Sequence, residues 1–254
     1  MKMLQICFLS LMMCVTSSYA QTTQTFNPQQ KQEIEQIISD YIINNPEILV
    51  KATQVLQKRQ QQAMMGKARK AISKHYKEVF NSPTSPVVGA KNAKATVVEY
   101  FDYQCIYCKR MEPVLEQLLE KDKEVRVVYK VFPIFGGASS FAARAVLAAN
   151  KQGKFVQLHR SLLEQRGKLS ESKILRLAKK AGIDVDRLKK DMKDKSIDEE
   201  LKANRRLMEK DLAVQGTPAF ILGPNPASET AKTYLVPGFV SLSMLQSLIN
   251  EVKA

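Results

Sequence analysis

The cysteines Cys105 and Cys108, in the stretch FDYQCIYCK, are the residues best suited to chemistry, and they are the only cysteines beyond residue 20. A pair at this spacing can close a disulfide staple, supply half of a metal site, or exchange electrons with another dithiol. A staple is a poor explanation. Cross-linking so short a loop stabilises a fold by only about 2 kcal/mol, against about 3 kcal/mol for a fifteen-residue loop.

A metal site is not favoured either. Zinc takes four ligands and the pair supplies two, while His75 and His159 lie far away without a matching spacing. A c-type haem needs a histidine directly after the second cysteine, where Lys109 stands. We therefore predict no metal and no cofactor. Copper handling by Met64, Met65 and the cysteines is an alternative, although methionines at helical spacing are usually core residues.

A redox pair explains both the spacing and the position of the cysteines. The apolar, β-branched run 95–101 predicts a strand that ends shortly before Cys105, where a helix begins. Unpaired N–H groups at a helix start favour negative charge and can lower a cysteine pKa from about 8.5 to between about 3.5 and 7.5. Cys108, one turn later, can resolve a mixed disulfide formed at Cys105.

Glu99 is a candidate acid six residues before Cys105, inside the predicted strand. Strand alternation alone leaves two readings. One is an edge-strand carboxylate facing water. The other is a buried acid whose raised pKa lets it pass protons to and from Cys108.

Other polar residues near the pair are expected to have structural roles. We predict that Asp102, Lys109 and Arg110 are solvated surface residues near the site. His75 is expected to be solvated on an amphipathic helix. His159, in FVQLHRSLL, is expected to pack within a helix rather than act as an acid–base catalyst.

A second constellation is QGTPAF, residues 215–220. Pro218 opens a predicted strand directly after Thr217, a place where proline is permitted. Only about 5–6% of X-Pro bonds in folded proteins are cis, so the local sequence does not reveal the geometry of this bond.

The elements that position these residues form an α/β domain. A strand, a helix and a second strand at 125–132 make a βαβ unit, so the sheet is parallel there and the crossover right-handed. A helical insertion follows at about 138–212. The chain then returns to strands at 217–223 and 233–239 and ends in a helix from Leu242.

The N-terminal region has a different pattern, rich in Gln, Lys and aliphatic residues. Helical spacing predicts a helix at about 28–43 and another from Pro46 to about residue 78, which would be roughly 50 Å long. Its apolar stripe needs a partner surface, either a second chain or the following domain. We therefore predict an N-terminal helical oligomerisation region at 21–82 and a catalytic domain at 83–254.

The first 20 residues have the layout of a secretory signal peptide. Lys2 is followed by an apolar stretch too short to span a membrane, and Ser18 and Ala20 supply the small residues of a cleavage site. A lipoprotein site at Cys14 is disfavoured by the bulky Met13. The sequence therefore predicts export.

The charge is strongly basic, +14 over 254 residues and +13 once Lys2 is removed with the leader. Most positive residues alternate with acids, as in DVDRLKKDMKDKSIDEE, which indicates solvated helical faces. We predict no nucleic-acid partner. Weak attraction to anionic membrane or cell-wall surfaces stays open.

Five stretches of the sequence resemble a known family: VVEYFDYQCIYCKRMEP, VRVVYKVFPIFG, FAARAVLAANKQGKF, VQGTPAFILG and VPGF. They resemble the thioredoxin superfamily, and specifically the DsbA-like periplasmic thiol–disulfide oxidoreductases. The match is best to the branch with an extra N-terminal helical region, which includes outer-membrane-associated surface antigens. It covers about residues 86–254. A C-x-x-C motif alone would be weak support, but here it lies between matching strands with the threonine-proline in register.

The resemblance implies a thioredoxin-like fold and a role for each candidate. Cys105 would be the nucleophile, Cys108 the resolving thiol, Glu99 the buried acid, and Pro218 a cis-proline facing the cysteines. The loop at Thr217 and Pro218 would hold an extended substrate segment by main-chain pairing.

One departure from the family concerns Ile106 and Tyr107, which stand where strongly oxidising members have Pro-His. Tyr107 carries no positive charge, so we expect a less depressed Cys105 pKa and a milder oxidant. Ile106 and Tyr107 are expected to shape the substrate groove. Thr217 before the proline resembles the isomerases of the family.

The resemblance further implies a periplasmic enzyme that forms and isomerises disulfides in unfolded or misoxidised exported proteins, with outer-membrane association as an alternative location. A membrane thiol oxidant or reductant would be its redox partner. A homodimer or trimer would form through the N-terminal helices. The alternative function is a non-catalytic surface antigen or holdase-type chaperone on the same fold.

Overall fold

The computed structural model describes residues 26–253, so the predicted signal peptide at 1–20 lies outside the described residues. The chain divides into two compact units, one ending at Gln57 and the other beginning at Lys58. Between residues 26 and 253, no helix combines the length and the hydropathy that a bilayer crossing requires.

Helix α1 (Pro28–Asn44) belongs to the first unit, as does the start of α2 (Glu47–Lys74). Asn27 and Gln30 form a capping box at the start of α1, and Pro28 occupies the first turn, which explains why the helix begins there. No residue of α1 is buried. Ile37, for example, is 67% exposed, so the apolar stripe that the sequence contains is uncovered in the single chain.

The end of α2 and the short helix α3 (Tyr76–Phe80) belong to the second unit, because Ile72 and Phe80 are each only 1% exposed and pack in its core. One expectation differs from this arrangement, because the predicted helix of 46–78 is interrupted at His75. The division into regions 21–82 and 83–254 stays a prediction, and the two compact units divide within the first of these regions, at 57/58. The sequence left two possible partner surfaces for the apolar stripe of the predicted helix, a second chain or the following domain. The following domain covers the C-terminal part of this stripe.

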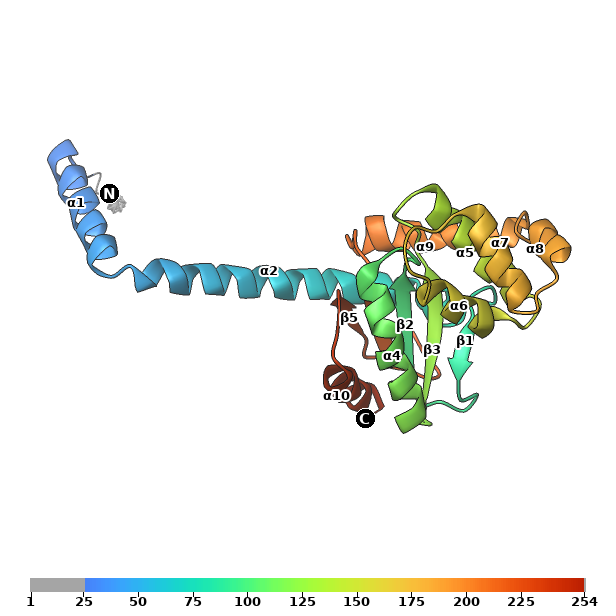
Figure 1. Ribbon diagram of the computed structural model, residues 1–254. Helices are drawn as coiled ribbons and strands as arrows, with labels where there is room; N and C mark the ends of the chain where they lie inside the picture. The colour runs from blue at the N-terminus through green and yellow to red at the C-terminus, as the bar shows by residue number, and fades with distance from the viewer. Residues whose placement is uncertain (1–25, 254) are drawn as a thin grey trace, which may run out of the picture. The chain divides into compact units, whose positions relative to one another are not determined.

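A five-stranded sheet forms the centre of the second unit, in the order β1-β3-β2-β4-β5 (Figure 1). The strands are β1 (Val87–Gly89), β2 (Ala95–Phe101), β3 (Val125–Val131), β4 (Ala219–Pro224) and β5 (Tyr234–Pro237). β2 and β3 are parallel and joined through α4 (Ile106–Lys121), as predicted, while the other pairs are antiparallel. The sequence did not predict β1, which has three residues.

Two layers cover the sheet, and the alternation of side chains along β2 assigns each residue to one of them. Val97 and Phe101 face the cluster that contains α4 and α10 (Leu242–Lys253). Val98 and Tyr100 face the cluster that contains α3. Glu99 lies between them in the strand and shares its face with Val97 and Phe101, the face that α4 covers.

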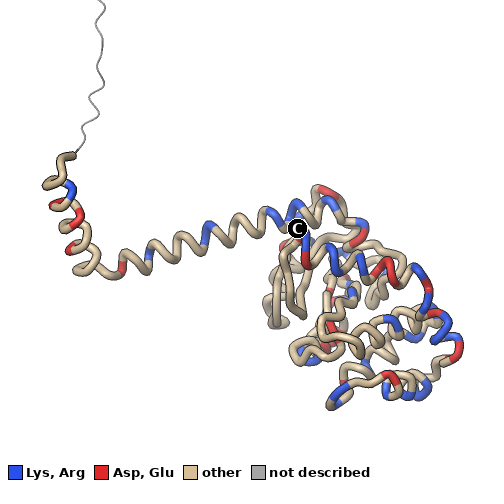
Figure 2. The backbone as a smooth tube through the Cα atoms, turned by 90° about the horizontal axis from the view of Figure 1, so that it is seen from above, with Lys and Arg blue, Asp and Glu red and all other residues tan. Residues whose placement is uncertain are grey.

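The helical insertion follows β3 as α5 (Gly137–Asn150), α6 (Phe155–Leu163), α7 (Glu171–Lys180), α8 (Val185–Asp191), α9 (Lys195–Arg206) and the π-helix η1 (Leu207–Asp211). These helices gather beside one end of the sheet, and α6 contacts α4 (Figure 1). Basic and acidic residues alternate along them (Figure 2), with pairs such as Arg187–Asp191 within one helix turn. This agrees with the predicted solvated faces.

A buried ion pair joins the insertion to the sheet. Lys130 Nζ on β3 lies 2.8 Å from Glu200 Oε1 on α9, and the two side chains are 2% and 7% exposed. The hydroxyls of Ser82 and Ser85 donate to Glu200, each at 2.5 Å, and Lys130 also donates to the carbonyl oxygen of Glu78. We call Lys130, Glu200, Ser82 and Ser85 the buried clasp, because it fastens the segment after α3 to the domain.

Candidate active site

Cys105 and Cys108 occupy the start of α4, where the sequence placed them. Cys105 is the N-cap residue in extended conformation, with φ −73° and ψ 121°, and the helix begins at Ile106. Cys108 lies in its first turn. Both are free thiols, Cys105 being 4% and Cys108 1% exposed.

The pKa of Cys105 is lowered to about 6. The main cause is the hydrogen bond from Cys108. Burial opposes the shift, and the backbone N–H groups of Cys108 and Tyr107 add to it. These amides are the unpaired donors of the helix start, so the physical reason expected from the sequence operates here. A substantial fraction of Cys105 is therefore thiolate at neutral pH.

The pKa of Cys108 moves in the opposite direction. Burial raises it most, followed by the hydrogen bond with Cys105 and the charge of Glu99. The two sulfurs therefore differ in protonation. Cys105 is the more readily ionised sulfur, while Cys108 stays protonated.

Removing the Cys108 thiol should raise the Cys105 pKa, because the strongest stabilising hydrogen bond is lost. In the reduced wild-type protein we expect a thiolate titration, followed by absorbance at 240 nm, with a midpoint near pH 6. In Cys108→Ala the midpoint should rise by about one unit or more. Tyr107→Ala is the control, because it keeps the backbone amide and should leave the midpoint unchanged. A wild-type midpoint at about 8.5, the ordinary cysteine value, would contradict this electrostatic account.

Glu99 is 2% exposed and lies on β2, which has a neighbouring strand on each side. An edge-strand carboxylate facing water is therefore excluded. Burial raises the Glu99 pKa well above its usual value, and the charges of Glu112 and then Cys105 raise it further. The Glu99 charge in turn raises the pKa of Cys108, so the two groups interact electrostatically within the buried site.

The Thr217–Pro218 peptide bond is cis, as the resemblance implies. The carbonyl oxygen of Thr217 lies 3.2 Å from Cys105 Sγ, so this loop faces the attacking sulfur. The carbonyl oxygen of Pro218 accepts a hydrogen bond from the Gly238 N–H at 2.8 Å, which ties the loop to the end of β5.

Asp102 is not a surface residue, and that prediction was wrong. It is fully buried and accepts hydrogen bonds from the N–H groups of Gln104, Ile134 and Phe135 and from the Ser139 hydroxyl, at 2.7 to 3.3 Å. These bonds fix the loop that leads into Cys105. The bond from Gln104 forms an Asx-turn, so an aspartate three residues before the N-cap Cys105 was the available signal.

Two other polar residues that were predicted to be solvated make contacts within the protein. Lys109 Nζ donates to the Gln165 carbonyl oxygen at 2.6 Å, which joins α4 to the segment after α6. The side chain of His75 is only 13% exposed and lies near Glu78 rather than in solvent. Arg110 is exposed, as expected.

Four large apolar side chains near this site are more than half exposed: Ile106, Tyr107, Phe135 and Phe239. The backbone N–H of Phe135 binds Asp102, and Phe239 follows the glycine that binds Pro218. We call these four residues the apolar rim. Only Ile106 and Tyr107 were predicted, because Phe135 and Phe239 lie in loops far away in the sequence.

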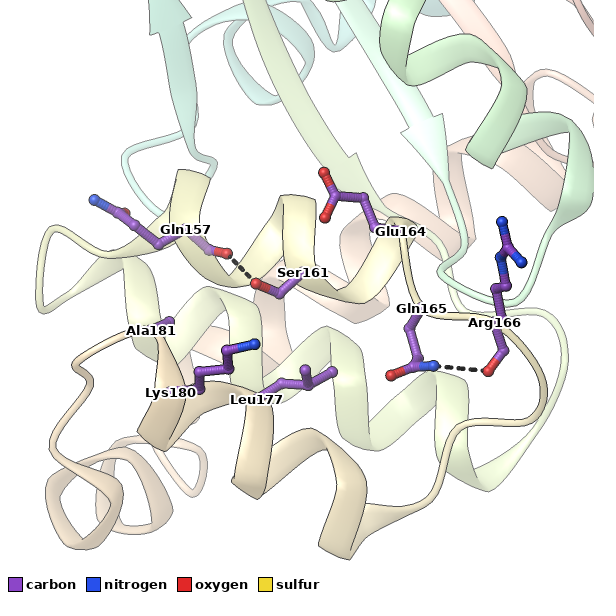
Figure 3. Close-up of a pocket in the computed structure, with 8 residues that line it drawn as sticks. All are labelled: Gln157, Ser161, Glu164, Gln165, Arg166, Leu177, Lys180 and Ala181. Atoms are coloured by element: carbon purple, nitrogen blue, oxygen red, sulfur yellow. Dashed lines mark hydrogen bonds between the residues drawn. The ribbon is translucent and has the colours of Figure 1, made fainter.

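A depression of about 500 Å³ lies between α6 and α7 (Figure 3). Its lining includes Gln157, Ser161, Glu164, Arg166 and Lys180, and it contains no residue of the cysteine site. This depression is therefore separate from the cysteine site.

A C-x-x-C pair at a helix start, facing a cis-proline loop beside a central mixed sheet, defines a thioredoxin-like fold of the DsbA type. Residues 96–250 match the DSBA-like thioredoxin domain, and the chain belongs to that family. Residues 30–63 match the N-terminal domain of the copper resistance protein ScsC.

Solved structures agree with this assignment. A thioredoxin-like oxidoreductase from Silicibacter pomeroyi is 38% identical, with a TM-score of 0.62 over 69% of this chain and 95% of that chain. BcfH from Salmonella enterica Typhimurium is 29% identical, with a TM-score of 0.73 over 89% and 97%. A linker-deletion variant of ScsC from Proteus mirabilis is 29% identical, with a TM-score of 0.63 over 91% and 98%. The last two similarities extend over most of the N-terminal helical region.

Curated relatives match over shorter parts. The Na(+)/H(+) antiporter NhaA 3 of Salinispora tropica is 34% identical over 142 residues, 54% of this chain and 21% of the antiporter. The chain thus spans about a fifth of that relative's length. A probable disulfide bond formation protein D of Bacillus cereus is 28% identical over 165 residues, 59% of this chain and 76% of that protein.

Proposed function

We propose that the protein is an exported protein thiol–disulfide oxidoreductase that uses Cys105 and Cys108. The observation that carries this proposal is the asymmetry of the pair. The Cys105 pKa is lowered to about 6 where it faces Thr217, while burial raises the pKa of Cys108 beside Glu99. A structural thiol pair has no need of this difference.

In the oxidising direction, a substrate thiolate attacks Cys105 Sγ and breaks the Cys105–Cys108 disulfide. Cys108 leaves as a thiolate and takes the proton of Glu99. A second substrate thiolate then attacks the substrate sulfur of the mixed disulfide and releases the Cys105 thiolate. The substrate dithiol loses two electrons and becomes a disulfide, while the protein's disulfide gains them. A membrane thiol oxidant or reductant would reset the pair.

Unfolded or misoxidised exported proteins are the proposed substrates. The apolar rim offers exposed side chains to the hydrophobic segments of such chains, and the backbone at Thr217 offers main-chain pairing to an extended segment. Neither feature requires a particular amino-acid sequence in the substrate. For location, we propose the periplasm. A further similar protein, from Salmonella enterica serovar Typhimurium and 32% identical, is described as a periplasmic thioredoxin-like protein, and residues 1–20 are a predicted signal peptide.

We further propose that the chain forms a homodimer or trimer through its N-terminal helices and isomerises disulfides. The support is the exposed apolar stripe of α1, on which Ile37, Ile38 and Tyr41 are each more than half exposed. Joining the chains there would present more than one redox site to the same misfolded substrate.

Deleting residues 21–57 from the mature protein should therefore turn an oligomer into a monomer, as measured by light scattering in solution. The deletion stops at the unit boundary because Ile72 and Phe80 belong to the core of the second unit. A double substitution, Ile37→Lys with Tyr41→Lys, should have the same effect without shortening the chain. A monomeric full-length protein would contradict the oligomer.

The function itself is tested with reduced and with scrambled ribonuclease. The full-length protein should restore activity to both substrates. The shortened protein should still oxidise reduced ribonuclease but lose most of its activity on the scrambled form. If neither substrate is processed by the full-length protein, the proposed function is wrong.

A further inference from the structure

A chain of three polar side chains adjoins the site and takes no part in the exchange steps described above. The Tyr103 hydroxyl lies 3.0 Å from His159 Nδ1, and His159 Nε2 lies 3.1 Å from Glu112 Oε2. Tyr103 and His159 are 1% and 2% exposed. The three residues come from the loop before Cys105, from α6 and from α4.

The direction of these hydrogen bonds follows from the tyrosine. Burial raises the pKa of Tyr103 well above its usual value, and the charge of Glu112 raises it further. The Tyr103 hydroxyl therefore keeps its proton and donates a hydrogen bond to Nδ1 of His159. With Nδ1 as acceptor, the ring proton sits on Nε2, and this N–H donates a hydrogen bond to the Glu112 carboxylate.

Aromatic side chains hold the imidazole of His159 in this orientation. Its ring is stacked on Phe155, with centroids 4.8 Å apart and 27° between the planes. Phe101 and Tyr129 meet it edge-on, at 5.1 and 4.7 Å. Rotation of the ring would break these contacts, so the position of Nε2 beside Glu112 is fixed.

Glu112 connects this chain to the cysteines. It lies one turn after Cys108 on α4, its side chain is 12% exposed, and it lines a depression of about 220 Å³. Its charge is the second cause, after burial, of the raised Glu99 pKa. The other titratable and charged groups around Glu112 and Glu99 are Lys109 and Glu116 on α4, Arg160 on α6, Glu164 after α6, Tyr129 on β3, and the two cysteines.

We propose that Tyr103 and His159 hold the Glu112 carboxylate in place, and that His159 is thereby a positioning residue that keeps Glu99 available as the proton donor to Cys108. The inference rests on the proposed function. It also gives the helical insertion a role in the exchange reaction, since His159 on α6 contacts Glu112 on α4.

Two substitutions of His159 separate its hydrogen bonds from its packing. His159→Phe keeps a ring in the aromatic surroundings but donates nothing to Glu112. His159→Gln places an amide N–H near the position of Nε2 and retains that donor. Gln157→Ala is the control on the same helix, because Gln157 lies two residues from His159 and lines the depression between α6 and α7 (Figure 3).

The readout is the rate at which dithiothreitol reduces the oxidised full-length protein, expressed per dithiothreitol thiolate, as a function of pH. At alkaline pH this rate falls as Glu99 loses its proton. Without the donated N–H, the Glu112 carboxylate is free to turn away from the site, so its charge acts less on Glu99 and Glu99 ionises at lower pH. In His159→Phe the alkaline fall should therefore move down by about one pH unit. It should stay unchanged in His159→Gln and Gln157→Ala.

The coupling through Glu112 is tested in a Glu112→Gln background, where His159→Phe should cause no further shift. A His159→Phe profile that coincides with the wild-type profile, or a shift that persists in that background, overturns the inference. Should His159→Phe fail to fold in a thermal melt, Tyr103→Phe takes its place, with a shift in the same direction expected. A wild-type protein that exchanges no disulfide at any pH overturns the proposed function, and this inference with it.

Discussion

Replacing Cys105 by serine should reduce thiol–disulfide exchange to the rate of buffer without protein. A serine hydroxyl at this helix start is not ionised near neutral pH, and its oxygen forms no bond equivalent to the mixed disulfide. The measurement is the dithiothreitol-dependent reduction of insulin, together with the recovery of scrambled ribonuclease. The fold should survive, because serine differs from cysteine by one atom.

Cys108→Ser is the matched control. It keeps the attacking sulfur but removes the resolving one, so the protein should accumulate a covalent mixed disulfide with a substrate, visible on a non-reducing gel. If Cys105→Ser retained full activity in both assays, the enzyme hypothesis would be wrong. A holdase-type chaperone or a surface antigen would then be the better interpretation.

Replacing Lys130 by methionine should destabilise the protein by about 3–5 kcal/mol, because it leaves the Glu200 carboxylate buried without its cation. Lys130 and Glu200 are 2% and 7% exposed, so water cannot solvate the orphaned charge. Chemical denaturation followed by circular dichroism measures the free energy of unfolding. Replacing Glu200 by leucine in the same chain should recover much of the loss, since an apolar pair needs no compensation.

An exposed pair provides the comparison for this prediction. Lys195 and Glu199 lie 3.8 Å apart, with side chains 90% and 65% exposed, and Lys195→Ala should cause no measurable change in stability. If Lys130→Met and Lys195→Ala changed the free energy of unfolding equally, the buried clasp would stabilise the fold no more than an exposed ion pair does.

The pH dependence of the same clasp has a definite sign. Burial alone would raise the pKa of Glu200, but Lys130 and the two serine hydroxyls hold it below its usual value. A carboxyl group with a lowered folded pKa stabilises the fold above its unfolded pKa, about 4.3, and loses that contribution as the pH falls through the folded value. The wild-type protein should therefore lose stability on acidification in a step that Lys130→Met lacks.

The sequence predicted much of this fold because its signals are local. The run 95–101 and the terminal helix from Leu242 are found where the patterns placed them. The helix break at His75 was missed because helical spacing continues across it into the short helix that contains Phe80.

In the candidate site, too, the local features were predicted and the long-range contacts were missed. The order strand, Cys105, helix is local, so the stabilised thiolate followed from the pattern. Asp102 was misjudged because its partners at Ile134 and Ser139 are more than thirty residues away. His159 was predicted to be packed, and it is. Its bonds to Tyr103 and Glu112 join residues about fifty positions apart, which no short-range pattern contains.

The contact between Cys105 and Thr217 has a consequence for biogenesis, because 112 positions separate the two residues. A chain that emerges N-terminus first exposes Cys105 long before the proline loop and β4, the antiparallel neighbour of β2, have emerged. During that interval the sulfur lacks its facing loop and is accessible to any passing thiol reagent. Pairing of β4 with β2, rather than folding of the first half of the domain, is therefore the event that brings the Thr217 loop against the cysteine.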